Sequence, residues 1–299
     1  MKSKSVLIVG CGDLGARAGS LLLEVGWSVT GLRRDTSRLP AGFAGLAADY
    51  AAANADLSVL EALAPDFVLL TLKPAGGGVE GYQAGFTHAV RTVLDGLGSH
   101  RPAGILMVSS TRVYAEAEGG WVDDDSALTT NDPAALAIID AEQLLFDSPH
   151  PACIVRSSGI YGDPDGFLLR RILRGELCPE SPVRYGNRIH RDDLGGLLAW
   201  LLQQWAEGVA PAQRMIAVDN DPAPQFEVET WLVQALGLTK WQEGASTPRG
   251  GGHKRCRNIA LSASGYVLRY PDYRAGYTAV VQARSETAKT GVDNHHDPE

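Results

Sequence analysis

The sequence predicts an α/β fold in which helices cover both faces of a parallel sheet. Three observations indicate this class. Short apolar segments alternate along the chain with amphipathic ones, which is typical of parallel strands joined by helical crossovers. A glycine-rich turn, Gly10 to Gly15, joins the first apolar segment to the first helical one. After about residue 158, glycine, proline and arginine interrupt the alternation, which predicts a smaller and more mixed second part.

The apolar segments are short enough to be buried strands, and stretches with helical periodicity lie between them. The expected strands are Val6–Val9, Val29–Leu32, Gly45–Ala48, Phe67–Leu72, Gly104–Ser109, Ala152–Ser157 and Arg214–Val218. The expected helices are Ala16–Val25, Leu57–Leu63, Tyr82–Leu97, Ala134–Phe146 and Asp193–Trp205. Since such crossovers are right-handed almost without exception, these units build a doubly wound parallel sheet of the Rossmann type.

The first turn of the chain has the residues that a dinucleotide-binding loop needs. The strand that ends at Val9 runs into Gly10-Cys11-Gly12-Asp13-Leu14-Gly15 and then into a helix. The first glycine makes the tight turn, the second lets the backbone approach a pyrophosphate, and the third lets helix and strand pack closely. The helix N-terminus then offers unpaired N–H groups to the phosphates. These six residues are candidate cofactor-binding residues, and Cys11 is interpreted as a small side chain in a crowded turn.

Composition excludes several classes of protein. The chain has 299 residues, is 44% hydrophobic and 21% charged, and carries a formal net charge of −8. This composition fits a globular protein and argues against sequence-independent binding of nucleic acid. We expect neither a membrane span nor a signal peptide. The four cysteines have no metal-binding or Cys-x-x-Cys spacing, so we expect reduced thiols in a cytoplasm and no metal site.

The change of pattern along the chain suggests its division. We expect residues 1–158 to form the dinucleotide-binding domain. Residues 159–284 form a substrate-side lobe, from which a late strand near residues 214–218 returns to the sheet. Residues 285–299 are polar and have no apolar period, so we expect a disordered tail.

Further segments follow the glycine loop in a family-specific order. The end of the fifth strand reads Ser109-Ser110-Thr111-Arg112-Val113-Tyr114, like Ser-Ser-x-x-Val-Tyr. Arg156 to Gly162 is similar to Arg-x-x-x-x-Tyr-Gly, and Ile189 to Asp193 is similar to Ile-His-x-x-Asp. Together they resemble the short-chain dehydrogenase/reductase superfamily, in particular its extended NAD-dependent epimerase/dehydratase branch. The resemblance covers about residues 4–283. It implies hydride transfer between a nicotinamide and a sugar, nucleotide-sugar or small carbonyl substrate.

The chain departs from this family at the catalytic pair. Relatives carry a tyrosine, followed four residues later by a lysine that lowers its pKa, on the helix after the fifth strand. Counted back from Glu142, these positions fall at Ala134 and Ile138, and no tyrosine in the chain has a lysine four residues on. The usual proton-transfer pair is absent, so an enzyme of this kind needs another proton donor, such as Tyr114, Tyr161 or Lys73.

The resemblance also assigns candidate catalytic residues. Ser110 matches a hydroxyl that hydrogen-bonds the reacting oxygen. The alternative is that this serine caps the turn at the end of the strand and has no catalytic role. Tyr114 matches a residue that lines the substrate pocket, with a packed aromatic as the alternative. Ser109 adjoins them as a cofactor-binding candidate. His190 is interpreted as structural or substrate-lining rather than catalytic.

Charged residues after neighbouring strands complete the candidate cofactor site. Arg33 and Arg34 follow the second strand, where relatives that prefer NAD carry an acid for the ribose 2′-hydroxyl. Because arginine binds a 2′-phosphate in a bidentate way, we expect NADP as the cofactor. NAD stays the alternative, since Asp35 is close enough in sequence to bind the ribose 2′-hydroxyl instead. Asp49 matches a residue that contacts adenine, or it caps a turn. Lys73 lies near the expected phosphates, or it is an exposed loop residue.

Two functions of different classes stay open. The chain is an NAD(P)(H)-dependent oxidoreductase or epimerase-like enzyme, or it is a non-catalytic NADP(H)-binding sensor or scaffold. Ser110 and Tyr114 favour the enzyme, whereas the absent pair favours the scaffold. We expect a small-molecule substrate as partner. Relatives commonly dimerise through helices that match residues 82–97 and 134–146, so a homodimer is an open alternative.

Overall fold

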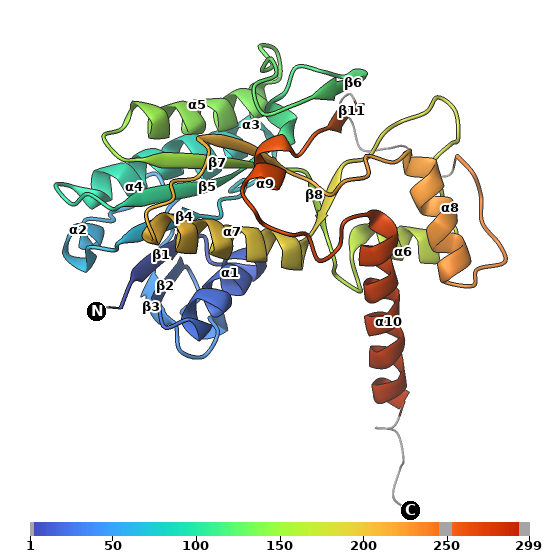
Figure 1. The fold of residues 1–299 in the computed structure, drawn as a ribbon, viewed down its shortest axis with the longest axis horizontal. Helices are drawn as coiled ribbons and strands as arrows, with labels where there is room; N and C mark the ends of the chain where they lie inside the picture. The colour runs from blue at the N-terminus through green and yellow to red at the C-terminus, as the bar shows by residue number, and fades with distance from the viewer. Residues whose placement is uncertain (1–2, 245–252, 293–299) are drawn as a thin grey trace, which may run out of the picture.

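The computed structural model describes residues 3–244 and 253–292 and confirms the expected fold class (Figure 1). Its central sheet has seven strands, all parallel, in the order β10-β7-β5-β4-β1-β2-β3. The strands are β1 Ser5–Val9, β2 Ser28–Arg33, β3 Ala44–Ala47, β4 Phe67–Leu70, β5 Gly104–Ser110, β7 Ala152–Ser157 and β10 Arg214–Ala217. Each expected strand forms, because apolar runs of this length are buried between two helical layers.

Helices cover both faces of the sheet, as Figure 1 shows. One face is covered by α1 Asp13–Glu24 and α7 Arg191–Ala206. The other is covered by α4 Ala89–Leu97 and α5 Pro133–Asp147, with the shorter α2 Val59–Leu63 and α3 Gly78–Tyr82 beside them. Short turns of other helix types are η1 Thr36–Arg38, η2 Gln83–His88 and η3 Thr111–Val113.

The expected helix at residues 82–97 differs in one respect, because its first part is the π-helical segment η2 between α3 and α4. Gly85 lies in this segment, and a Cβ there would lie 2.1 Å from the backbone oxygen of Lys73. The π-helical geometry therefore coincides with a close approach of the helix to the loop after β4.

The two faces of the sheet bury two separate apolar cores. Successive residues of β1 alternate between them: Leu7 and Val9 belong to the core under α4 and α5, and Val6 and Ile8 to the core under α1 and α7. This alternation is the period of two of a β-strand. Because both faces are covered, strands that read as continuous apolar runs are buried on each side.

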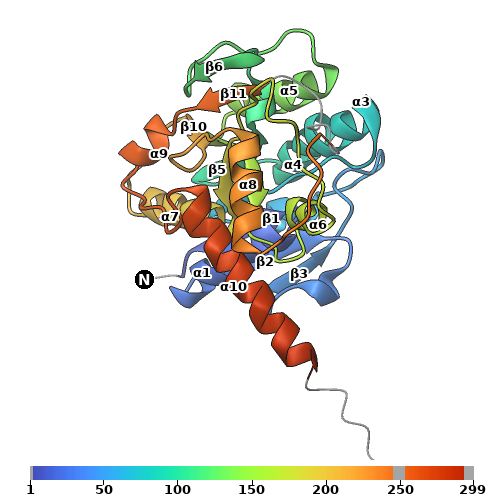
Figure 2. The same cartoon turned by 90° about the vertical axis from the view of Figure 1, so that its right-hand side faces the viewer.

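The second part of the chain adds smaller units beyond the carboxyl ends of the strands (Figures 1 and 2). Helices α6 Phe167–Leu173, α8 Gln225–Ala235 and α10 Tyr273–Val292 share a third apolar cluster. Two small parallel sheets pair β8 Gly159–Tyr161 with β9 Arg188–His190, and β6 Glu118–Val122 with β11 His253–Cys256. Helix α9 Ile259–Ala263 packs near β10. The sequence did not predict these short elements, since only tertiary contacts stabilise them.

Helix α10 changes one expectation about the end of the chain. Residues 285–292, expected to be disordered, continue this helix, which projects from the body of the molecule (Figure 2). The helix is anchored upstream, where Tyr273 and Tyr277 are buried. The remaining residues of the expected tail, 293–299, lie outside the described residues. Within the described ranges, no helix has the length and apolar character to cross a membrane.

A buried ion pair ties α5 to the sheet. Glu142 on α5 and Arg156 on β7 are joined by contacts of 2.7 and 3.2 Å, and each side chain is only 3% exposed. Glu142 also accepts a hydrogen bond from Ser109 on β5, and Arg156 donates one to the hydroxyl of Tyr114. Removing one partner of such a pair leaves an uncompensated buried charge, which is strongly destabilising.

We expect Glu142→Gln to lower the free energy of unfolding by about 3–5 kcal/mol, because the Arg156 guanidinium would stay buried without its carboxylate. Urea denaturation at neutral pH measures this change. Glu176→Gln is the matched control, since Glu176 pairs with Arg174 at 2.8 Å on the surface. The control should change the free energy of unfolding by less than about 1 kcal/mol. Equal losses in the two variants would contradict a special role of the buried pair.

Candidate functional site

The glycine loop lies at the edge of the sheet where the carboxyl ends of the strands meet (Figure 1). Gly10 has a φ of +76°, a backbone conformation that glycine adopts without strain. The backbone N–H groups of Gly10 and Cys11 both donate to the oxygen of Leu32 on β2, at 3.0 and 3.1 Å. The neighbouring strand therefore holds the turn in place.

The three glycines of the loop differ in their surroundings. A Cβ on Gly10 would lie 2.7 Å from the oxygen of Thr71, and one on Gly15 would lie 2.8 Å from the side chain of Ile8. Neither position has room for a side chain. A Cβ on Gly12 would meet nothing nearer than 3.7 Å. Gly12 therefore faces open space, which is the free approach that a pyrophosphate needs.

Helix α1 begins on this open side of the loop. Its N-cap is Gly12 and no side chain caps it, so the N–H groups of residues 13–15 have no side-chain acceptor. The carboxylate of Asp13 would weaken an anion site here, but it pairs with Arg17 at 3.1 Å and lies 3.9 Å from Arg191. The N-terminus of α1 therefore offers backbone N–H donors to a phosphate, and the charge of the neighbouring Asp13 is balanced by arginines.

Cys11 fits the interpretation of a small packed side chain. It is 1% exposed, and a Cβ on Gly31 would lie 3.2 Å from its sulfur. Burial raises the pKa of the thiol to about 11, with a smaller opposing effect of Arg33. The thiol is therefore protonated at neutral pH and is a poor nucleophile.

The charged residues after β2 and β3 lie together beside the loop. Arg33 donates from Nη1 to a backbone oxygen of the glycine loop at 3.0 Å. Arg34 is 75% exposed and lies 3.8 Å from Asp49. Asp35 instead accepts hydrogen bonds from the backbone and hydroxyl of Ser37, at 3.2 and 2.6 Å. The charged side chain that contacts the glycine loop is thus Arg33, whereas the carboxylate of Asp35 is bound to Ser37.

The two serines at the end of β5 have different surroundings. Ser109 is 5% exposed and its hydroxyl donates to Glu142 in the core at 2.5 Å. Its side chain therefore does not reach the open edge, contrary to its placement beside a cofactor. Ser110 is partly exposed, and its Oγ accepts from the N–H of Arg112 at 3.1 Å. The O–H of Ser110 has no acceptor among the described residues and can donate to a ligand.

Tyr114 is a packed aromatic, the alternative that its sequence context left open. It is 3% exposed and its hydroxyl accepts a hydrogen bond from Arg156 at 3.2 Å. Burial raises the pKa of this phenol to about 12, although the guanidinium opposes the shift. A phenol with this pKa exchanges its proton poorly at neutral pH.

Helix α5 has no proton-transferring side chain at the family positions. Asp132 caps the helix by accepting from the N–H groups of Ala134 and Ala135, at 3.1 and 3.3 Å. Ala134 and Ile138 are both buried. The helix therefore presents buried apolar side chains at these two positions.

Two other candidates have separate environments. Lys73 is exposed on the loop after β4. His190 is buried and caps α7, where its Nδ1 accepts from the N–H of Asp192 at 3.2 Å. Burial lowers the pKa of His190 to about 4, against the opposing effect of Asp192. The imidazole is therefore neutral at physiological pH, in agreement with a structural role.

A cavity of about 660 Å³ adjoins the glycine loop on the side of the second lobe. Asp13 lines it from the loop, and Tyr161, Asn187, Arg188 and Arg191 line it from the opposite elements. Among the described residues, neither Ser110 nor Tyr114 lines this cavity. Its position next to the glycine loop makes it the candidate ligand pocket among the described residues.

Sequence reasoning missed two buried charges beside this cavity. Arg188 on β9 is 5% exposed, and Asp219 just beyond β10 is 2% exposed. Burial raises the pKa of Asp219 to about 7, although Arg188 lowers it. The two residues meet because the start of β9 lies beside the segment that follows β10, where the N–H of Asp219 donates to the backbone oxygen of Arg188 at 2.8 Å. No local signal could have indicated this contact.

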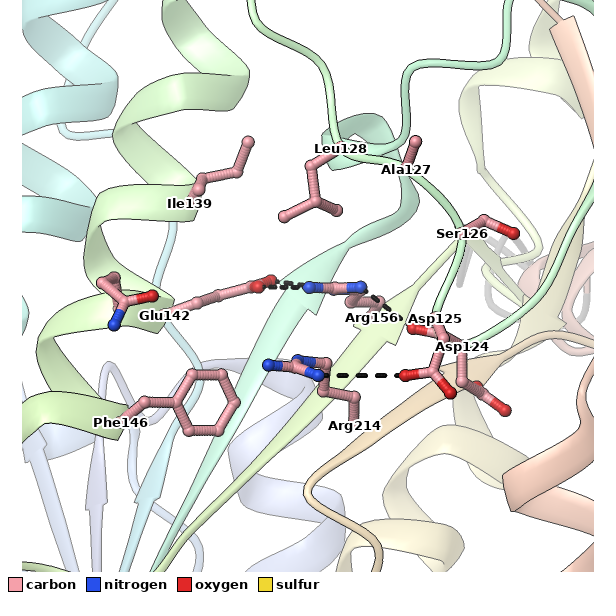
Figure 3. Close-up of a pocket in the computed structure, with 11 residues that line it drawn as sticks. Asp124, Asp125, Ser126, Ala127, Leu128, Ile139, Glu142, Phe146, Arg156 and Arg214 are labelled. Carbon is pink, nitrogen blue, oxygen red and sulfur yellow. Dashed lines mark hydrogen bonds and ion pairs between the residues drawn. The ribbon is translucent and has the colours of Figure 1, made fainter.

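A smaller cavity of about 250 Å³ lies against α5, away from the glycine loop (Figure 3). The Glu142–Arg156 pair crosses it, and Arg214 reaches Asp125 at 3.8 Å while its guanidinium stacks on Phe146. None of the candidate residues expected from the sequence lines this cavity. Its charged groups pair with one another, so it is not the candidate site.

Comparisons of sequence and structure show which known proteins this chain resembles. No family model matches the chain. Protein YeeZ of Escherichia coli (strain K12) is 27% identical over 286 residues, which cover 90% of this chain and 97% of YeeZ. A solved structure from Methylobacillus flagellatus, whose protein is named as an NAD-dependent epimerase/dehydratase, is 32% identical. It covers 95% of this chain and 100% of its own, with a TM-score of 0.79.

The chain belongs to the NAD-dependent epimerase/dehydratase family. A more distant structure, UDP-glucuronic acid 4-epimerase from Bacillus cereus, is 17% identical and covers 95% of this chain and 98% of its own, with a TM-score of 0.75. At this identity it shows a shared fold alone. The family resemblance of the sequence motifs is thus confirmed.

The raised pKa of Asp219 predicts a pH-dependent stability. The raised pKa keeps a proton on this carboxyl in the folded state up to about pH 7, whereas an unfolded aspartate loses its proton near pH 3.8. The free energy of unfolding should therefore fall as pH rises through this range, by about 2–3 kcal/mol between pH 5 and pH 8.

Asp219→Asn, which keeps the side chain neutral, should remove this decrease relative to the unsubstituted protein. Urea denaturation at both pH values measures it. Asp125→Asn is the control, because the side chain of Asp125 is 89% exposed. The same pH dependence in the Asp219→Asn variant would contradict the assignment of the proton to this carboxyl.

Proposed function

We propose that this protein binds a nicotinamide dinucleotide, NADP(H) in preference to NAD(H), and is an epimerase-like oxidoreductase. The observation that carries the proposal is the open face of Gly12 at the uncapped start of α1. The Bacillus cereus epimerase that shares the fold was solved in complex with NAD. A sugar, nucleotide-sugar or small carbonyl substrate would react beside Ser110, and the adjoining cavity, which Ser110 does not line, would take the part of a larger substrate that extends beyond this serine.

Each part of the candidate site has a task in this proposal. The backbone of residues 10–15 would hold the pyrophosphate, and Arg33 and Arg34 would pair with a 2′-phosphate. When bound, the nicotinamide supplies or accepts a hydride. The free O–H of Ser110 would donate to the substrate oxygen and stabilise negative charge on it.

A second function, a non-catalytic NADP(H)-binding sensor or scaffold, is favoured by one observation. Ala134 and Ile138 replace the usual tyrosine and lysine, and Tyr114 is buried. A panel of sugars, nucleotide sugars and small carbonyls, followed by absorbance of the reduced cofactor, separates the two functions. Turnover of any substrate favours the enzyme, and tight cofactor binding without turnover favours the scaffold.

Two further expectations stay as proposals. We place the protein in a cytoplasm, in keeping with four cysteines that are all free and buried. We also propose that the protein can form a homodimer through α4 and α5, and analytical ultracentrifugation would test this assembly.

We expect Gly12→Val to weaken NADPH binding at least tenfold, roughly 1.4 kcal/mol, because a branched side chain would fill the approach of the pyrophosphate. Isothermal titration calorimetry measures the affinity. The fold should be retained, since a Cβ at this position meets no atom nearer than 3.7 Å. Urea denaturation of the same variant is the control. Unchanged NADPH affinity in the folded variant would remove the dinucleotide site from this loop.

The unsubstituted protein should bind NADPH at least tenfold more tightly than NADH, since a charge-assisted contact to a phosphate contributes about 1.5–3 kcal/mol. Arg34→Gln should narrow this difference, and it leaves the bond from Arg33 to the glycine loop in place. Arg38→Gln is the matched control, because Arg38 is also exposed and pairs with Asp35 at 3.6 Å. Equal affinities for the two cofactors in the unsubstituted protein would show that the arginines form only a solvated turn.

A further inference from the structure

A lysine from near the end of the chain lies at the carboxyl end of β5. The Nζ of Lys254 donates to the backbone oxygens of Thr111 and Tyr114, at 3.3 and 3.4 Å. Thr111 directly follows Ser110, the residue with the free hydroxyl. A cation from β11 thus reaches the strand end that carries the candidate catalytic serine.

The position of Lys254 is fixed by backbone contacts on both sides. Strand β11 pairs in parallel with β6, with His253 opposite Glu118 and Arg255 opposite Trp121 (Figure 1). The side chain of Asn187 donates to the oxygen of Lys254 at 2.9 Å and accepts from the N–H of Cys256 at 2.8 Å. Asn187 also lines the larger cavity, so the backbone of Lys254 is bound to a residue of the cavity wall, although Lys254 is not itself one of the lining residues.

The ammonium group has no dedicated counter-ion. Among the described residues, no carboxylate forms an ion pair with Lys254, which is partly buried. The titratable groups that act on it are Cys256 on its own strand, Glu116 before β6 and Asp132 at the start of α5.

Both of these acids are engaged elsewhere. Asp132 pairs with Arg112 at 2.6 Å, and Glu116 accepts from backbone N–H groups before and within β6. Burial lowers the pKa of Lys254, and the three neighbouring groups oppose the shift only in part. A lysine in this environment gives up and regains a proton more readily than an exposed one.

The other candidate proton donors are less well placed. The hydroxyl of Tyr114 is bound to Arg156 in the core, and Lys73 is exposed on the loop after β4. The hydroxyl of Tyr161 is buried, and burial raises its pKa well above the usual range. Asp132, which interacts with Lys254, caps α5 two residues before Ala134, the position of the absent tyrosine.

We propose that Lys254 is the proton-transferring catalytic residue of this site, in place of the tyrosine and lysine that α5 lacks. The inference rests on the proposed function, which supplies the hydride through the cofactor. In the direction of reduction, an N–H bond of the Lys254 ammonium breaks and an O–H bond forms on the substrate oxyanion held at Ser110. The neutral amine then takes a proton from solvent. In the direction of oxidation, the neutral amine accepts the proton of the substrate hydroxyl.

The first test needs no turnover. The full-length protein is labelled with acetic anhydride over a range of pH, and the labelling rate of each lysine is followed by peptide mass spectrometry. We expect Lys254 to label with a midpoint at lower pH than Lys240, an exposed lysine in the second lobe. Equal midpoints for the two lysines would overturn the proposal, because the midpoint reports the pKa whatever the accessibility.

The second test uses turnover and calorimetry of variants. Lys254→Met should lower kcat at least 100-fold at neutral pH, the usual range for a lost acid/base group. NADPH affinity should change less than twofold, since the glycine loop holds the cofactor. Lys254→Arg keeps the positive charge, but a guanidinium does not lose its proton near neutral pH. The turnover of this variant should therefore stay at least tenfold below that of the unsubstituted protein, and the pH inflection of kcat should be lost. Lys240→Met is the matched control and should retain full turnover.

Three outcomes decide between the proposals. Recovery of the original pH profile in Lys254→Arg shows that the lysine only supports the turn after β5, and this overturns its catalytic role. Tight NADPH binding without turnover of any substrate also overturns that role, and leaves the cofactor site standing. Absence of NADPH binding in the unsubstituted protein removes the proposed function itself.

Discussion

The buried pair of Glu142 and Arg156 is the constraint on which the carboxyl edge of the central sheet depends. Its carboxylate and guanidinium are withdrawn from water, so each must be satisfied inside the fold. Figure 3 shows the contacts of Arg156 with Glu142 and with the backbone oxygen of Asp124. In addition, Glu142 accepts from Ser109, and Arg156 donates to Tyr114. One interaction therefore joins a helix, two adjacent strands and the loop after β6. Small shifts of α5 along the sheet would break several hydrogen bonds at once.

This constraint explains the arrangement at the end of β5. Because Ser109 turns inward to the pair, the alternation of a strand turns Ser110 toward the opposite side. Tyr114 is drawn into the core by the same guanidinium and is lost to proton transfer. The backbone of the following turn is left with oxygens that accept from Lys254. The same short segment after β5 thus contains the buried hydroxyl of Tyr114 and the backbone oxygens that bind Lys254.

The surroundings of the glycine loop differ in charge from the rest of this acidic protein. The chain has a net charge of −8, yet the acids closest to the glycine loop are paired or bound to backbone N–H groups. Asp13 pairs with Arg17, and Asp35 is occupied by Ser37. Arg17 also bonds Asp192 at the start of α7, which links the loop to the segment leading into the second lobe. The edge around the glycine loop therefore presents helix N–H groups and arginines in spite of the overall charge.

The sequence by itself determined the features that depend on neighbours along the chain. Apolar segments with their intervening helices specify the parallel sheet, and Gly10, Gly12 and Gly15 specify the turn between β1 and α1, since periodicity and backbone freedom are local properties. The tertiary structure alone decided which polar side chains meet. Lys254 and Thr111 are 143 positions apart and come together through the pairing of β11 with β6. Burial and charge pairing depend on such long-range contacts, so local patterns could not indicate that Tyr114 and Asp219 are buried, or that Lys254 reaches the turn after β5.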